Sequence, residues 1–387
     1  MKIGIEGQRL YRTKKHGMDM VALELIKNLQ RIDHENEYVV FVKPDDDKNC
    51  IPQAPNFKII ELRGGPYPIW EQFALPRAAK KEGCDMLHCT SNTGPIWSSV
   101  PLITILHDII YLESFSIFKR GGTWYQKLGN MYRRFVVPPV VRKSKRVSTV
   151  SNFERERIKN FMRLGNNLVT IYNGVGEYFK KIDDENVLTA AKEKYKLPDH
   201  FLFFLGNTDP KKNTPNVLKA FAEFNAQSAL KYKLVMLDYE ESALQKILAD
   251  VGHSEVRKDI HLTGYVENTD LPAIVNQCEV FLYPSLRESF GIPILEGMAC
   301  GVPVITSNTS SMPEIAGDAA YIVTPTNPEE ISTAIVTILN NKELKNDLCE
   351  KGLERAKKFS WGNMAKAYLG LYKEVYAEIN STPGKNP

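Results

Sequence analysis

Short runs of β-branched and aromatic residues alternate with stretches of helical periodicity along the whole 387-residue chain. A helical pattern over residues 20–29 follows the first strand-like run, and the strand-like runs of the first half lie at 2–5, 37–42, 86–88, 101–106, 146–150 and 167–171. Alternation of this kind predicts parallel sheets that are covered by helices. The sequence therefore predicts an α/β protein.

The alternation starts again after residue 180. A polar stretch, 180–199, leads to a strand-like run at 201–205 and a helical pattern over 217–226. Further strand-like runs follow at 233–237, 260–263, 280–282 and 304–307. At roughly 100–200 residues per domain, a chain of this length predicts two domains. We expect one Rossmann-like domain over 1–178, a second over 179–361, and a final helix within 362–387.

Composition excludes several classes of protein. The apolar fraction of 43% and the charged fraction of 25% are ordinary for a globular chain, which argues against disorder or a collagen-like repeat. No apolar run approaches the ~18 residues that span a membrane. Six scattered cysteines without a CxxC pair predict neither a zinc site nor a disulfide framework. The opening MKIGIEG reads as a strand and not as a signal peptide, so we expect a cytoplasmic protein.

Charge is distributed unevenly between the two halves. Residues 1–178 carry 27 Lys and Arg against 18 Asp and Glu, whereas residues 179–387 carry 23 against 28. No acid occurs between Glu113 and Glu154, an interval that holds nine basic residues: Lys119, Arg120, Lys127, Arg133, Arg134, Arg142, Lys143, Lys145 and Arg146. The chain contains no recognisable nucleic-acid reading module, so we expect no nucleic-acid partner.

Segment 119–146 of this interval also holds four aromatic residues: Trp124, Tyr125, Tyr132 and Phe135. Basic residues mixed with interfacial aromatics suit an anionic membrane surface, which makes segment 119–146 a candidate for peripheral membrane contact. The alternative is that Trp124 and Tyr132 are core residues and that the charges solvate a helix.

Segment 284–305 holds the densest set of candidate ligand-binding residues. Neither GxGxxG nor GxxxxGK[ST] occurs in the chain, so a nucleotide must be held in another way. The segment follows a strand-like run at 280–282, and Pro293 and Gly301 fit the beginning and the end of a helix. The sequence therefore predicts a strand, a loop and a helix in this order.

Phosphate-binding potential lies at the beginning of that helix. Phe290, Gly291 and Ile292 would place backbone amides at its N-terminus, where the free N–H groups and the helix dipole favour an anion. Glu288 precedes the helix and Glu296 lies one turn inside it. Two carboxylates so placed can contact different parts of one extended ligand, and a sugar nucleotide has that shape.

Further motifs accompany these two glutamates. The second half contains Pro210-Lys211-Lys212-Asn213, Thr263-Gly264-Tyr265-Val266, Pro284-Ser285 and Gly301-Val302-Pro303-Val304, and the first half contains His107-Asp108, Val150-Ser151 and Asn173-Gly174. Together they resemble the retaining glycosyltransferases of family 4 over nearly the whole chain. That family has the GT-B fold, in which two Rossmann-like domains with parallel sheets face each other across a cleft.

The resemblance implies a role for each matching residue. Glu296 would bind the ribose hydroxyls and Glu288 the hydroxyls of the donor sugar. The amides of Phe290, Gly291 and Ile292 would contact the diphosphate. The other implied donor-binding residues are Gly17, Gly206, Lys211, Tyr265 and Val266, of which the main chain of the last two would frame the base.

The implied catalytic residues are Glu288, Lys212 and His107. Lys212 would neutralise the leaving diphosphate and His107 would face the donor sugar. The resemblance also implies that residues 1–178 bind the acceptor, that 179–361 bind the nucleotide sugar, and that the final helix crosses back to the first domain.

Two positions depart from the family's usual pattern. Lys211 stands where an arginine is usual, which keeps the charge and loses a planar bidentate donor. Gly17-Met18-Asp19 stands where a glycine-rich turn is usual and places an acid near the expected diphosphate.

The implied reaction transfers a hexose, with retention, from a nucleoside-diphosphate sugar to a hydroxyl of a glycan or lipid-linked acceptor, in cell-surface polysaccharide or lipopolysaccharide synthesis. The motifs lean toward GDP-mannose, although a UDP-sugar remains open. We expect no metal and no other cofactor, and a place in the cytoplasm or on the inner face of the membrane. The alternatives are a non-catalytic nucleotide-sugar-binding protein and a GT-B sugar-nucleotide epimerase.

Overall fold

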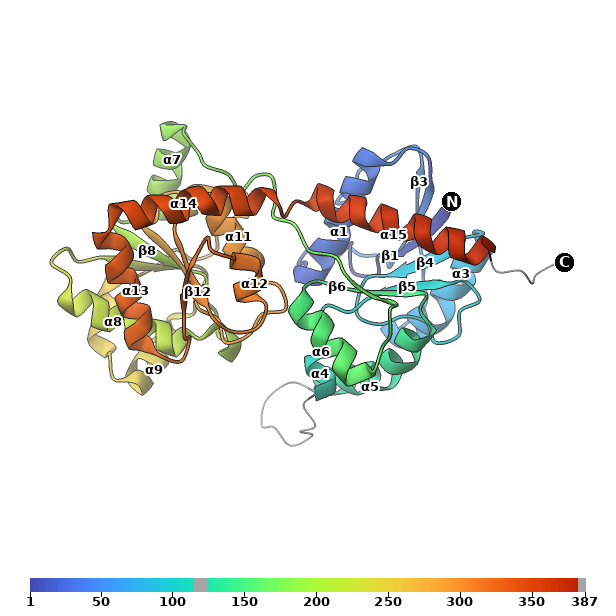
Figure 1. Ribbon diagram of the computed structural model, residues 1–387, viewed down its shortest axis with the longest axis horizontal. Helices are drawn as coiled ribbons and strands as arrows, with labels where there is room; N and C mark the ends of the chain where they lie inside the picture. Colours follow the sequence, from blue (N-terminus) through green and yellow to red (C-terminus); the bar gives the residue numbers. More distant parts are fainter. Residues whose placement is uncertain (114–123, 382–387) are drawn as a thin grey trace. The chain divides into compact units, whose positions relative to one another are not determined.

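The computed structural model describes residues 1–113 and 124–381 (Figure 1). Contacts divide the chain into two units, of which unit 1 comprises residues 1–173 and 361–387 and unit 2 comprises residues 174–360. Each unit is built around one parallel sheet. The predicted α/β class with two Rossmann-like sheets is confirmed.

Unit 1 contains a parallel sheet of seven strands in the order β3-β2-β1-β4-β5-β6-β7. The strands are β1 (Lys2–Glu6), β2 (Glu37–Val42), β3 (Phe57–Glu61), β4 (Met86–Cys89), β5 (Leu102–Ile105), β6 (Arg146–Thr149) and β7 (Leu168–Thr170). Its larger helices are α1 (Gly17–Ile32), α3 (Leu75–Lys81), α5 (Trp124–Lys143), α6 (Asn152–Met162) and α15 (Trp361–Ser381). The shorter ones are α2 (Tyr67–Ile69), the π-helical η1 (Trp70–Ala74) and α4 (Ile110–Glu113).

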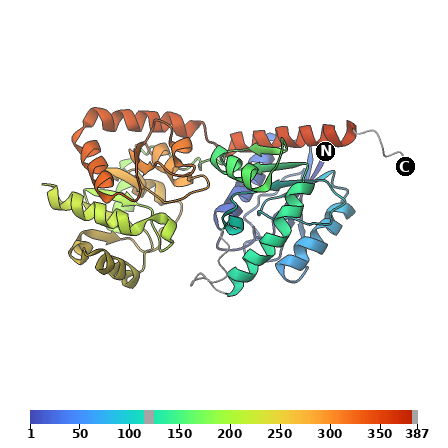
Figure 2. The same ribbon diagram turned by 60° about the horizontal axis from the view of Figure 1, so that its bottom comes forward.

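Helices cover both faces of the unit 1 sheet (Figure 2). On one face α15 packs beside α1, and Tyr372 Oη lies 2.7 Å from Nδ1 of His88 in β4. The neighbouring β4 residue Leu87 points to the other face and joins a buried cluster with Trp70 of η1 and Val136 of α5. Because side chains alternate along a strand, one short strand thus supports both layers.

Unit 2 contains a parallel sheet of six strands in the order β10-β9-β8-β11-β12-β13. The strands are β8 (Phe201–Phe204), β9 (Lys233–Met236), β10 (Ile260–Leu262), β11 (Val280–Tyr283), β12 (Val304–Ser307) and β13 (Tyr321–Val323). Its helices are α7 (Glu185–Tyr195), α8 (Thr214–Gln227), α9 (Glu241–Val251), α10 (Leu271–Val275), α11 (Ile292–Ala299), α12 (Met312–Ala316), α13 (Pro328–Asn340) and α14 (Lys342–Lys357), with the 3-10 turns η2 (Pro210–Lys212) and η3 (Ser254–Asp259).

Close packing of α11 on the unit 2 sheet depends on a glycine. A Cβ added to Gly297 would lie 2.9 Å from Cγ2 of Val304 and 3.0 Å from Cγ of Phe281, closer than ordinary packing allows. On the opposite face, α8, α9 and α13 pack on alternate strand residues such as Leu202 and Leu282. The glycine therefore allows α11 to lie close to β11 and β12.

Each sheet reverses its strand order once, between β1 and β4 in unit 1 and between β8 and β11 in unit 2. In open parallel sheets, ligands bind outside the carboxyl ends of the strands at such a switch point. The structure therefore offers two places at which to look for a site.

Two strands, β3 and β13, lie outside the strand-like runs identified in the sequence. In the described part of the chain, no helix is long and apolar enough to cross a membrane.

Candidate active site

A lysine, a tyrosine and a glutamate meet at the unit 2 switch point. Lys212, at the end of η2, follows β8, whereas Tyr283 ends β11 and Glu288 lies in the loop after it. The Lys212 Nζ donates to Tyr283 Oη at 2.6 Å and to Glu288 Oε1 at 2.8 Å. Tyr283 Oη in turn donates to Glu288 Oε1 at 2.9 Å. The site thus holds a preformed ion pair between Lys212 and Glu288, and the buried Tyr283 hydroxyl is hydrogen-bonded to both partners.

The Tyr283 phenol is a stable donor. Burial, together with the nearby carboxylates Glu288 and Glu296, holds the pKa of Tyr283 well above its usual value. It therefore stays protonated at any physiological pH and can bridge the lysine and the carboxylate. No sequence motif had indicated a role for this residue.

Asn213 fixes the place of Lys212. Its backbone takes a left-handed conformation, with φ of 65°, and its side-chain Nδ2 donates to the carbonyls of Pro284 at 2.9 Å and Pro325 at 2.6 Å. Asparagine tolerates this backbone region better than most residues. It belongs to a recognised motif, but its positioning role became visible only in the structure.

Hydrogen bonds of its main chain hold the loop between β11 and α11 against the rest of unit 2. Ser311 Oγ donates to the carbonyls of Glu288 and Phe290, both at 2.9 Å. The Leu286 N–H donates to the carbonyl of Lys211 at 2.7 Å, which joins this loop to η2. Glu288 therefore stands on a fixed stretch of backbone.

Helix α11 begins where the sequence analysis placed it. Gly291 is its N-cap with φ of +98°, a conformation that favours glycine, and Ile292 is its first residue. Phe290 is buried and packs edge-on against Phe359, with ring centroids 5.9 Å apart. The first N–H groups of a helix lack partners within it and carry the positive end of its dipole, which suits an anion.

Glu296 lies within α11, four residues after Ile292. Burial raises the pKa of this carboxyl to about 7, and the positive charge of Lys212 acts in the opposite direction. Neutral and ionised forms of Glu296 therefore coexist near neutral pH.

The other predicted donor-binding residues of unit 2 lie around this cluster without joining it. Lys211 is exposed, with its Nζ 3.9 Å from the Asp209 carboxylate, and Tyr265 is 75% exposed on the loop after β10, with Val266 following it. Gly206 follows β8, and a Cβ there would lie 2.1 Å from Cε1 of Phe204.

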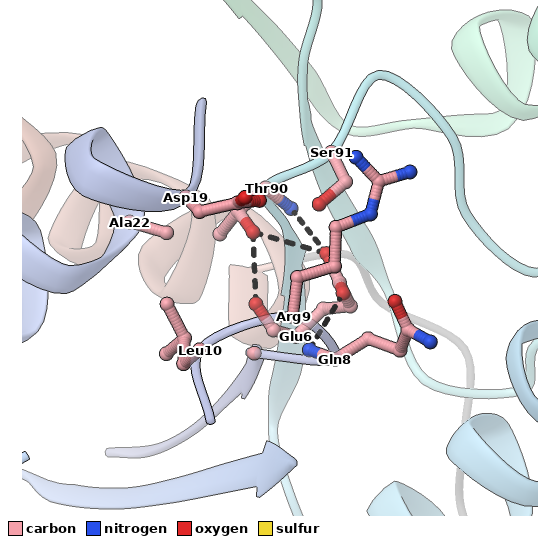
Figure 3. A pocket seen from close by; sticks show the side chains of 9 residues that line it. Glu6, Gln8, Arg9, Leu10, Asp19, Ala22, Thr90 and Ser91 are labelled. Atoms are coloured by element: carbon pink, nitrogen blue, oxygen red, sulfur yellow. Dashed lines mark hydrogen bonds between the residues drawn. The ribbon is translucent and has the colours of Figure 1, made fainter. Parts of the chain in front are cut away.

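The unit 1 switch point contains His107. This residue is buried after β5, its Nε2 lies 3.1 Å from the Thr90 carbonyl, and its backbone N–H donates to Asn92 Oδ1 at 2.6 Å. Burial lowers its pKa, so the imidazole is neutral at physiological pH. Thr90 also lines a hollow at the end of β1 (Figure 3).

Gly17 is the exposed first residue of α1. Asp19, the acid noted beside it in the sequence, is buried and accepts a hydrogen bond from the His16 N–H at 2.9 Å. It therefore acts as part of the helix cap, which is a structural reason for an acid at this position.

The structure describes only part of the basic segment 119–146. Lys119 and Arg120 lie outside the described residues, as do the side chains of Trp124, Tyr125 and Lys127. For Tyr132 the structure favours the alternative of a core-facing residue, because its hydroxyl donates to buried Glu71 and accepts from Gln72 Nε2. Leu128, Met131 and Phe135 of α5 are instead exposed, at 54%, 51% and 73%.

Comparison with known sequences identifies the family. The profile of the glycosyl transferases group 1 matches residues 189–355, and that of glycosyltransferase family 4 matches residues 16–176. The chain belongs to the family 4, group 1 glycosyltransferases. The predicted family and its GT-B fold are confirmed.

Curated relatives and solved structures resemble the chain to different extents. The O-antigen chain mannosyltransferase B of Escherichia coli is 32% identical over 59% of this chain and 61% of its own length. The serotype-specific mannosyltransferase WbdA of Escherichia coli is 31% identical over 51% of this chain and 25% of its own. The chain thus spans less than two thirds of these curated relatives. The sucrose-phosphate synthase of Thermosynechococcus elongatus has a TM-score of 0.76 at 16% identity, covers 97% of this chain and 99% of its own, and supports the fold alone.

Proposed function

We propose that this family 4 member is a retaining hexosyltransferase. It moves a sugar from a nucleoside diphosphate to a hydroxyl of a glycan or lipid-linked acceptor. The observation that carries the proposal is the contact of Lys212, Tyr283 and Glu288 beside the N-terminus of α11, at a switch point. This arrangement joins a cation, a hydrogen-bonding carboxylate and helix amides, which are the groups that a sugar diphosphate requires.

Each part of the donor has a partner in this arrangement. The diphosphate would lie against the first turn of α11, where the helix dipole and the Lys212 ammonium offset its charge. Glu288 would accept hydrogen bonds from the sugar hydroxyls, and Glu296 from the ribose hydroxyls. The Tyr283 phenol keeps the lysine and Glu288 in place before the donor arrives.

The transfer then exchanges one bond at the anomeric carbon. The bond from this carbon to the diphosphate oxygen breaks, and the acceptor oxygen bonds to the carbon on the same face. The acceptor proton passes to the departing diphosphate oxygen, so no proton acceptor from the protein is needed. The main task of the protein is to stabilise the charge that develops on the diphosphate, and Lys212 and the α11 amides are suited to it.

GDP-mannose is the proposed donor, and a bacterial cell-surface polysaccharide or lipopolysaccharide the proposed product. The support is the similarity to two mannosyltransferases, one of which is described as an O-antigen chain enzyme. A UDP-sugar is the competing donor.

Release of nucleoside diphosphate tests the proposal. The full chain is mixed with GDP-mannose, UDP-glucose and UDP-N-acetylglucosamine in turn, with and without a crude glycan acceptor, and Lys212→Met serves as the control. We expect GDP release that depends on the acceptor and is lost in the variant. Binding without release would favour a non-catalytic sugar-nucleotide protein, and a new sugar epimer without release would favour an epimerase.

Peripheral contact with the cytoplasmic face of an anionic membrane is the proposed location of the reaction. Leu128, Met131 and Phe135 form an exposed apolar stripe on α5 at helical spacing, in a segment rich in Lys and Arg. Such a surface suits acidic lipid headgroups.

Co-sedimentation with phosphatidylserine vesicles compares the wild type with a variant that carries serine at these three positions. Phe161→Ser, which changes an exposed residue of α6, is the matched control. Equal sedimentation of all three proteins, or binding that is insensitive to salt, would contradict the proposed membrane contact.

A further inference from the structure

The loop that follows β4, residues 90–96, makes two hydrogen bonds to His107, and we call it the β4 loop. Nε2 of the imidazole lies 3.1 Å from the Thr90 carbonyl, and the His107 N–H donates to Asn92 Oδ1 at 2.6 Å. A carbonyl oxygen can only accept, so Nε2 carries the ring proton. Because burial lowers the pKa of His107, the ring is neutral and its other nitrogen, Nδ1, is an acceptor. The β4 loop therefore determines which ring nitrogen can accept a hydrogen bond from a substrate.

Glu6, the last residue of β1, holds the first residue of the β4 loop. Its Oε2 accepts from the Thr90 N–H at 3.2 Å and from Thr90 Oγ1 at 3.0 Å, and its Oε1 accepts from the Gln8 N–H at 2.9 Å (Figure 3). Both Glu6 and Thr90 are buried. Because the Thr90 carbonyl in turn holds Nε2 of His107, a single residue separates the Glu6 carboxylate from the imidazole.

The rest of the β4 loop is held by Glu71 and Gln72 of η1. Glu71 accepts from the Thr93 hydroxyl. Gln72 Nε2 donates to the Gly94 carbonyl at 2.9 Å, and Gln72 Oε1 accepts from the Ile96 N–H at 2.9 Å. The turn that carries these two side chains is π-helical, and such turns are rare and frequently lie at functional sites.

Neither glutamate has a basic partner. Glu71 is completely buried, and the other groups that donate to it are neutral: the hydroxyls of Tyr67 and Tyr132, and Gln72 Nε2. Burial raises the pKa of Glu71, and the nearby charge of Glu6 acts in the same direction. A buried acid without a cation is costly, whereas a fully hydrogen-bonded buried network makes its surroundings rigid. The structure that both glutamates hold in place is the β4 loop.

We propose that Glu6 and Glu71 are positioning residues for His107. By fixing the β4 loop at Thr90 and at Thr93, they hold the imidazole as the Nε2–H tautomer and leave Nδ1 to accept from a hydroxyl of the bound sugar. This rests on the proposed function, and on the contact between His107 and the donor sugar that the family resemblance implies. The other tautomer would turn a lone pair toward the Thr90 carbonyl and would offer the sugar a donor in place of an acceptor.

Nitrogen NMR of the histidine rings tests this without any turnover. The full chain is labelled with nitrogen-15 histidine, and the signals of His107 are assigned by their loss in His107→Gln. The wild type should show a protonated Nε2 and an unprotonated Nδ1, with neither signal changing between about pH 6 and pH 8. Glu6→Gln sets an amide N–H against the Gln8 N–H or the Thr90 donors, and Glu71→Met removes the acceptor for Thr93. Both variants should move the two His107 signals toward each other, as a mixture of tautomers does.

Asp33→Asn is the matched control for Glu6→Gln. Asp33 is also a buried acid of unit 1, and it accepts from Asn36 and Tyr38 and from no residue of the β4 loop. It should leave the His107 signals unchanged. Thr93→Val and Thr93→Ser differ in the hydroxyl that donates to Glu71, so only the valine should move these signals. Melting temperatures establish which variants are folded, and the Thr93 pair keeps the test open if Glu71→Met is not.

Transfer kinetics show whether the glutamates act through His107. The value of kcat should fall about tenfold in Glu6→Gln and in Glu71→Met, while nucleotide affinity stays within about threefold of the wild type. When His107→Gln is already present, Glu6→Gln should cause no further loss, because effects that pass through one residue are not additive.

Unchanged His107 signals in Glu6→Gln, or in both Glu71→Met and Thr93→Val, would overturn the proposal, and so would an equal change in Asp33→Asn. A loss of kcat from Glu6→Gln that persists in the His107→Gln protein would also overturn it. Absence of nucleoside diphosphate release with every donor would instead contradict the proposed transferase activity. The ring signals would still show whether the two glutamates fix His107, so the two failures can be told apart.

Discussion

Replacing Glu296 by glutamine should stabilise unit 2 and weaken nucleotide binding at the same time. Burial raises the pKa of this carboxyl from 4.5 to about 7, which means that the folded protein disfavours its ionised form. An acid whose pKa is raised on folding costs no stability below its unfolded pKa. The cost grows as the pH rises through the interval between the two values and is constant above the folded pKa.

The size of this effect follows from the shift. A pKa change of one unit corresponds to about 1.4 kcal/mol, so a shift from 4.5 to about 7 sets an upper limit of about 3 kcal/mol above pH 7. Glu296 is only partly buried, and water therefore screens some of this cost. We expect glutamine to stabilise unit 2 by about 2–3 kcal/mol at pH 8–9 and by under ~1 kcal/mol at pH 5.

Urea unfolding at several pH values measures this difference. All four tryptophans, Trp70, Trp97, Trp124 and Trp361, belong to unit 1. Tryptophan fluorescence therefore follows unit 1, whereas far-UV circular dichroism follows both units. The variant should shift the transition seen by dichroism and leave the fluorescence transition unchanged. A stability difference that is the same at pH 5 and pH 9, or a variant that is less stable at pH 9, would contradict a raised pKa of Glu296 in the folded protein.

Nucleotide affinity provides the second half of the test. A carboxylate accepts hydrogen bonds from both ribose hydroxyls, whereas the amide of glutamine offers one oxygen and would oppose the second hydroxyl with an N–H. We expect GDP or UDP to bind the variant about tenfold more weakly at pH 8. A residue whose ionised form costs stability and supports binding is typical of a functional site.

Four further outcomes are expected. Glu288→Gln should leave donor affinity within about threefold and lower kcat by about tenfold or more, because contacts to the reacting sugar strengthen in the transition state; wild-type kcat at saturating donor would contradict its role. Tyr283→Phe should lower kcat by about tenfold with little change in melting temperature, since it removes only the hydroxyl that bridges Lys212 and Glu288. Tyr239→Phe, which removes the hydroxyl of another buried tyrosine of unit 2, should leave kcat unchanged. Transfer should persist in EDTA, and loss that magnesium or manganese restores would reveal a metal site. Gly206→Ala should destabilise unit 2 by about 1–3 kcal/mol in thermal unfolding, because its Cβ would press on the Phe204 ring, and an unchanged melting temperature would argue against this packing.

Periodicity predicted the fold well because both sheets are parallel. Strands buried on both faces form continuous apolar runs, as at β8 and β11, and these are visible without any structure. The edge strand β3 escaped notice because its sequence FKIIE mixes charged and apolar residues, as an edge strand exposed to solvent often does.

The contact between Lys212 and Glu288 could be anticipated, but their bridging partner could not. The two residues are 76 positions apart, yet each follows a central strand of one sheet, and parallel strands bring their carboxyl ends to a common edge. Tyr283 looks like an ordinary strand aromatic. Only the structure reveals that its hydroxyl emerges at the end of β11.

The core-facing position of Tyr132 has a simple physical cause. Its partners on α5 at helical spacing are Val136 and Val140, both buried, so Tyr132 lies on the core-facing side of the helix. Leu128, Met131 and Phe135 follow the same spacing on the exposed side. The charge pattern marks the whole segment as a candidate surface, whereas the orientation of α5 about its own axis determines which of its side chains are exposed to solvent.

The ion pair at the unit 2 switch point also determines which substitutions are informative. Lys212 and Glu288 have side chains only 15% and 12% exposed, so neither charge is well solvated without the other. Removing one partner of such a pair leaves an uncompensated charge, which is more damaging than the pair itself is stabilising. Glu288→Ala would therefore disturb Lys212 as well as any sugar contact. Glu288→Gln retains an oxygen that can accept from both Lys212 and Tyr283, so a loss of turnover in this variant reports on the carboxylate charge itself.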